Sequence, residues 1–64
     1  MEINDNQIFK QIRDMGAQGL TPAQIASLLR IPAAEREAFL DEFTRPETKV
    51  YESYANGKAM MDYN

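Results

Sequence analysis

The stretch LTPAQIASLLRIP, residues 20–32, decides how the chain folds. Thr21 and Gln24 form a capping box, in which the threonine hydroxyl accepts from the Gln24 amide and the glutamine side chain reaches back. Pro22 stands at the first helical position, where the N–H that proline lacks would have no helical partner. Pro32 disfavours helical geometry at the residue before it. These signals predict a helix over residues 22–30.

Three further helices are predicted around this one. Apolar residues recur at helical spacing over residues 5–15 and again over residues 33–43. The sequence TRPE at 44–47 is a second capping box and predicts a fourth helix over residues 46–62. The expected fold is all-α, a three- to four-helix bundle with a helix-turn-helix-like unit, in a single domain over residues 1–64.

A stripe of residues in the fourth predicted helix forms a seam. Its members follow one another at helical spacing and are Val50, Tyr54, Gly57 and Met61. A glycine inside a helix costs ~1 kcal/mol relative to alanine, so Gly57 indicates either a close backbone approach or a break. The continuous helix is favoured because residues 58–61 resume the same period. This seam is the candidate interface for a partner helix or a second copy of the chain.

The composition argues against catalysis. The 64 residues include no His and no Cys, which removes disulfides, the usual zinc sites, thiolate nucleophiles and histidine-based triads. Neighbouring acidic residues on one helix point in directions about 100° apart, so they do not converge on a metal or a substrate. We therefore expect no enzyme activity, no cofactor and no small-molecule substrate.

The sequence also bears on location. No apolar run approaches the ~20 residues that a membrane helix needs, and the acidic, polar start does not resemble a signal peptide. The absence of Cys fits a cytoplasmic protein. The chain ends at Asn64 without a glycine or basic cap signal, which predicts that it is the N-terminal part of a longer protein.

Residues 20–43 resemble a helix-turn-helix unit, in which Ile25 packs inward and Ala26 lets the two helices approach closely. Such units lay their second helix in the major groove of DNA. Together with DEF at 41–43 and YANGKA at 54–59, this pattern is similar to phage and prophage proteins of the small terminase type. The resemblance implies viral DNA recognition, oligomerisation through following helices and no catalysis in this subunit.

The sequence departs from the helix-turn-helix pattern at three places. Arg30 stands where a turn glycine is usual, and Arg36 stands where the second helix usually buries Val or Ile. The second helix also exposes acidic residues, and the formal charge of the chain is −3. A helix face of this kind repels a polyanion. The stem of Arg36 is expected to lie over apolar surface.

Two readings of the function follow. The first is a DNA-binding module of phage or mobile-element type that contacts double-stranded DNA through scattered basic residues, namely Lys10, Arg13, Arg30, Arg45 and Lys49. The second is a protein-interaction or oligomerisation domain that keeps the helix-turn-helix shape without binding DNA. The acidic charge favours the second reading and the resemblance favours the first. The sequence leaves open whether the five basic residues share one surface.

Overall fold

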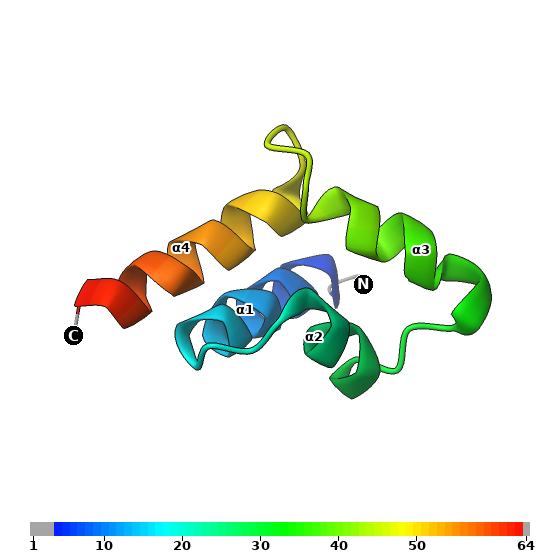
Figure 1. Cartoon of the computed structure of the whole chain (residues 1–64), viewed down its shortest axis with the longest axis horizontal. Coiled ribbons are helices and arrows are strands. Elements are labelled where there is room, and N and C mark those ends of the chain that lie inside the picture. Colours follow the sequence, from blue (N-terminus) through cyan, green and yellow to red (C-terminus); the bar gives the residue numbers. More distant parts are fainter. Residues whose placement is uncertain (1–3, 64) are drawn as a thin grey trace.

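Four helices make up the fold in the computed structural model, which describes the backbone of residues 4–63 and the side chains of residues 7–61. Asn64, the basis for predicting a longer protein, lies outside the described residues. The helices are α1 (Asn4–Ala17), α2 (Pro22–Leu28), α3 (Ala33–Glu42) and α4 (Lys49–Tyr63). Figure 1 shows α3 and α4 forming an arch over α1 and α2. The expected all-α fold is confirmed, and residues 4–63 contain no strand.

The capping box at the start of α2 is confirmed. Thr21 Oγ1 accepts from the Gln24 amide at 3.2 Å, and the Thr21 amide donates to Gln24 Oε1 at 2.8 Å. Two of the orphan amides at this helix end are thereby satisfied. Leu20 and Ile25, on either side of the cap, both belong to the core, as expected for residues that flank such a start.

The same backbone motif closes α1 and α2. At the end of α1 the Leu20 amide donates to the Met15 carbonyl at 3.1 Å, and Gly19 adopts a left-handed φ of 84°. At the end of α2 the Ile31 amide donates to the Ala26 carbonyl at 3.0 Å. This is the Schellman arrangement, which places a residue with positive φ just beyond the helix. In α2 that residue is Arg30, with φ 59°, and the helix stops at Leu28, two residues before the predicted end.

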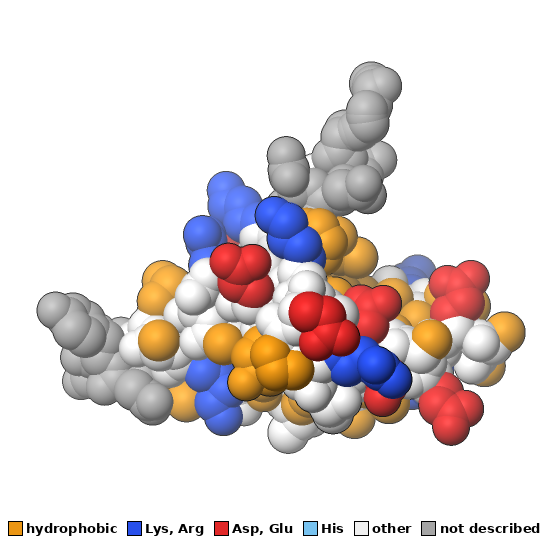
Figure 2. Space-filling model, turned by 90° about the horizontal axis from the view of Figure 1, so that it is seen from above, with side chains coloured by type: hydrophobic (Ala, Val, Ile, Leu, Met, Phe, Trp, Pro, Cys, Tyr) orange, Lys and Arg blue, Asp and Glu red, His pale blue; other side chains and the backbone are white. Residues whose placement is uncertain are grey.

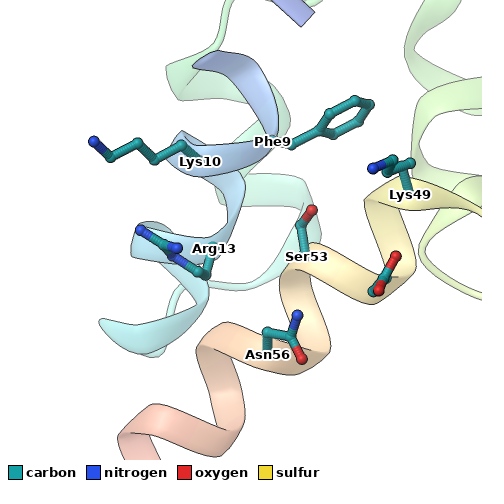
Figure 3. A pocket seen from close by; sticks show the side chains of 7 residues that line it. Phe9, Lys10, Arg13, Lys49, Ser53 and Asn56 are labelled. Atoms are coloured by element: carbon teal, nitrogen blue, oxygen red, sulfur yellow. The ribbon is translucent and has the colours of Figure 1, made fainter. Parts of the chain in front are cut away.

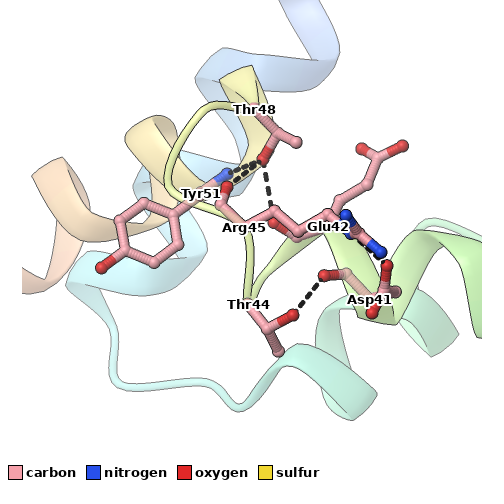
Figure 4. A network of polar contacts seen from close by, with 6 residues as sticks. All are labelled: Asp41, Glu42, Thr44, Arg45, Thr48 and Tyr51. Atoms are coloured by element: carbon pink, nitrogen blue, oxygen red, sulfur yellow. Dashed lines mark hydrogen bonds and ion pairs between the residues drawn. The ribbon is translucent and has the colours of Figure 1, made fainter.

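The start of α4 differs from the prediction. The TRPE box at 44–47 does not form, and the helix begins at Lys49. Thr44 Oγ1 instead donates to the Asp41 carbonyl at 2.7 Å, which ties the residue to the end of α3 (Figure 4). Thr48 acts as the cap, since its Oγ1 accepts from the Tyr51 amide at 3.1 Å. The Thr48 hydroxyl also lies within donating distance of the Glu42 and Arg45 carbonyls.

Four residues meet at the centre of the core. Three come from α1, α2 and α4, and the fourth directly follows α3. They are Ile12, Ile25, Val50 and Phe43. The Phe43 ring packs edge to face against Tyr54, with centroids 5.1 Å apart. The Tyr54 hydroxyl donates to the Leu20 carbonyl at 2.7 Å, which fastens α4 to the loop after α1. Every described helix therefore contributes to, or directly precedes, this single core.

The most extensive helix–helix contact joins α1 and α4, and a pair of buried glycines allows it. A Cβ placed on Gly57 would lie 2.0 Å from the Arg13 carbonyl oxygen, and one on Gly16 would lie 2.9 Å from that of Tyr54. Neither position has room for a side chain. The predicted continuous helix and the close backbone approach at Gly57 are thus both confirmed, and the backbone approached is that of α1.

Candidate functional site

Basic residues from α1 and α4 gather around one open groove. Lys10 and Arg13 lie one turn apart on α1, and Lys49 is the first residue of α4. All three line a groove of about 540 Å³ (Figure 3). Lys10 and Arg13 extend on one side of this groove, and Lys49 lies on the other side near Phe9 (Figure 3). Three of the five predicted nucleic-acid contacts therefore share one surface.

Aromatic and polar side chains complete this groove. Phe9 lines it from α1, and Lys49 Nζ lies 5.9 Å from the centroid of the Phe9 ring, within cation–π range. Ser53 and Asn56 line it from α4 and add uncharged hydrogen-bonding groups. Glu52 is the acidic member of the lining. The groove thus offers three cations and two uncharged polar groups against one carboxylate.

Arg13 retains unused hydrogen-bonding capacity. Its side chain is 41% exposed, and one terminal nitrogen lies 3.4 Å from the carboxylate of Asp14, an exposed and long contact. Its Nε is buried and has no acceptor among the described residues. The exposed terminal nitrogens of the guanidinium are the groups that a ligand can reach. The guanidinium is suited to an oxyanion such as a phosphate.

The other two predicted contacts lie elsewhere. Arg30 occupies the turn between α2 and α3 and does not line the groove. Arg45 lies in the connection before α4 and forms an ion pair with Asp41 (Figure 4). The hydrogen bond that Arg45 Nε donates to the Asp41 carboxylate, and the negative charge of that carboxylate, raise the pKa of Arg45. Arg45 is therefore already engaged by an acid of the same chain.

The predicted partner seam faces the interior of the chain. Val50 is 5% exposed and belongs to the core, and Gly57 is buried against the backbone of α1. Tyr54 is half-buried through its contacts with Phe43 and the Leu20 carbonyl. Met61 is also half-buried, with its sulfur close to Gly19. Within the chain the helix that packs on this seam is α1, and the role of the seam as a partner interface stays a prediction.

Acidic side chains dominate the α3 end of the molecule. Glu35, Glu37 and Asp41 are exposed, and Glu42 is half-buried. In Figure 2 several Lys and Arg side chains lie together at one edge of the molecule, while acidic side chains lie both over its middle and over the α3 end. The exposed face of the second helix of the helix-turn-helix-like unit is therefore acidic, as predicted from the sequence.

The groove also contains residues that the sequence does not mark as functional, among them Ser53 and Asn56. They follow the predicted contact Lys49 at helical spacing, one residue before the seam positions 54 and 57. This polar stripe is visible in the sequence once the neighbouring seam is known to be buried. Phe9 carried no polar signal, and its place in the groove follows from the packing of α1 on α4.

Among the described residues no group of three or more Asp, Glu, His or Cys side chains is placed to hold a metal ion. In that same part of the chain, every helix is too short or too polar to span a membrane. Comparisons with known protein families, curated proteins and solved structures found no match to this chain.

Proposed function

We propose that this chain is a non-catalytic, helix-turn-helix-like module of phage or mobile-element type, which contacts the phosphate groups of double-stranded DNA. The observation that carries the proposal is that Lys10, Arg13 and Lys49 line the same groove between α1 and α4. Lysine and arginine that neutralise phosphates supply most of the affinity in sequence-independent binding. The DNA-contacting surface is then the α1–α4 side.

The charge distribution favours this orientation. The acidic side chains exposed along α3 repel a polyanion, so we expect DNA to approach the α1–α4 side. Ser53 and Asn56 add hydrogen-bonding groups that suit phosphate oxygens. With only three cations in the groove, the binding is weak and strongly dependent on salt.

A second candidate function is a protein-interaction domain. Within the chain α1 packs on the seam that first suggested it, and a different surface also favours it. The observation in its favour is Leu28, a leucine on α2 that is 61% exposed. Leu28 lines a groove together with Leu20 and Ala23, so it belongs to a continuous apolar surface, the kind that marks partner-binding sites.

Fluorescence anisotropy with a labelled duplex in low-salt buffer tests the DNA proposal. The double variant Lys10→Ala with Lys49→Ala should bind at least about tenfold more weakly, because two charge-assisted contacts are worth on the order of 1.4 kcal/mol or more. The matched control is Arg30→Ala with Arg45→Ala, which removes the same charge outside the groove. Equal losses in the two double variants, or no binding by the unaltered chain, would reject the proposal. Circular dichroism establishes that each variant is folded.

A further inference from the structure

A second groove lies between α2 and α3, and none of its residues lines the basic groove. Its volume is about 390 Å³. Leu28, on its wall, is the most exposed of the large apolar side chains in the described part of the chain. The remaining lining residues are Leu20, Ala23, Gln24, Ser27 and Arg36. The surface is thus mostly apolar and contains a single charge, that of Arg36.

Arg36 is held in place by α2. One terminal nitrogen of its guanidinium donates to the Ala23 carbonyl at 3.2 Å and to Ser27 Oγ at 2.8 Å. No carboxylate of the described residues lies within ion-pair distance of Arg36. Both of its hydrogen bonds come from a single nitrogen, which leaves the N–H groups of Nε and Nη1 for another acceptor. The side chain is therefore a fixed cation that lacks an acidic partner in this part of the chain.

We propose that this groove binds a helical segment of a partner protein, which places one apolar side chain against Leu28 and one carboxylate on Arg36. A carboxylate is the complement of the groove's single charge, and it can accept a charge-assisted hydrogen bond from Nε or Nη1 of Arg36. A helix presents the two side chains on one face when they are three or four residues apart. This inference does not depend on the DNA proposal.

The acidic charge of α3 opposes further acids on the partner. Glu35 and Glu37 neighbour Arg36 on α3 and are exposed, and neither lines the groove. Their negative charge acts on additional partner acids at longer range, which is unfavourable. A strongly acidic segment is thus selected against, and a segment with one acid beside an apolar residue is selected for.

NMR titration of the ¹⁵N-labelled full chain tests the proposal. The probe is an alanine-based helical peptide of about 15 residues with one Leu and one Glu four positions apart. We expect shifts at the amides of residues 23–28 and at Arg36 Nε. The peptide carrying Gln in place of Glu should bind about tenfold more weakly, since it lacks the charge-assisted pair. A peptide with two added Glu residues should also bind more weakly.

Two variants of the chain complete the test. Leu28→Ala alters an exposed side chain, so the fold is retained while affinity for the Leu–Glu peptide falls. Arg36→Gln removes the only charge of the groove, and it should reduce the preference for Glu over Gln. Equal affinity for the Glu and Gln peptides, or shifts outside the groove, would overturn the proposal. So would sedimentation showing that a second copy of the chain covers Leu28.

Discussion

Arg30 holds a backbone conformation that glycine normally supplies. Its φ of 59° closes the Schellman motif at the end of α2, where the corresponding residue of α1 is Gly19. For a residue with a Cβ, this left-handed conformation costs roughly 1–2 kcal/mol. The sequence already marked the position, since a turn glycine is usual there. Nothing in the sequence indicates that Arg30 itself adopts the left-handed conformation that glycine usually supplies.

We therefore predict that Arg30→Gly stabilises the chain. The free energy of unfolding should rise by about 1 kcal/mol, because the steric cost exceeds the additional backbone entropy that glycine loses on folding. Urea denaturation followed by circular dichroism measures this change. Arg30→Ala is the control, because alanine retains the Cβ and should bring no such gain. A loss of stability in the glycine variant would contradict this description of the turn.

Glu52 is the one acidic residue that lines the basic groove. Replacing it with glutamine removes a like charge from the path of a phosphate, so Glu52→Gln should tighten duplex binding about two- to threefold at low salt. Anisotropy titrations measure the effect. The matched control is Glu37→Gln on α3, which changes the net charge equally. A larger gain from Glu37→Gln would show that α3, and not the groove, faces the DNA.

At the scale of elements, the two threonines around the α3–α4 connection show where local sequence signals become ambiguous. Thr44 and Thr48 are both suited to cap a helix, and the TRPE pattern favoured Thr44. The structure uses Thr48, because Thr44 bonds to the Asp41 carbonyl and Arg45 pairs with the Asp41 carboxylate. These bonds keep the segment attached to α3, a tertiary preference that a capping pattern does not contain.

Thr48→Ala should lower the free energy of unfolding by about 1 kcal/mol or slightly more, since it removes the cap of α4 and the bond to the end of α3. Thr44→Ala should cost less, because Thr44 is exposed and caps no helix. Chemical denaturation of the two variants side by side gives the comparison. A greater loss of unfolding free energy for Thr44→Ala would show that Thr44 caps α4 and that the helix begins before Lys49.

The α1–α4 crossing depends on Gly57. Gly57→Ala places a methyl group where the Arg13 carbonyl oxygen already lies, so the two helices must separate. We expect a loss of about 3 kcal/mol or more, which is a large part of the stability of a chain this small. The neighbouring exposed substitution Lys58→Ala should stay within about 0.5 kcal/mol. Denaturation curves of the two variants that coincide would rule out the close crossing.

At the scale of the whole molecule, hydrophobic periodicity and the signals at helix ends predict that four helices form. They do not predict which residues share a surface. The four helices and the cap at Thr21 follow from local patterns. Which basic residues share a surface depends on how α1 crosses α4, a contact between parts of the chain far apart in sequence. For the same reason the seam at Gly57 suggested a partner, although its neighbour is α1. The spacing of the seam residues predicts that another helix packs closely on α4, but it does not identify that helix.

The salt dependence of duplex binding tests the central claim, that the α1–α4 groove contacts DNA phosphates. Three phosphate contacts predict a slope of about −2.7 for the logarithm of the binding constant against that of salt concentration. In the Lys10→Ala, Lys49→Ala variant the slope should become shallower by about 1.8, while Arg30→Ala with Arg45→Ala should leave it unchanged. An unchanged slope in the groove variant, or an equal reduction in both, would contradict the claim.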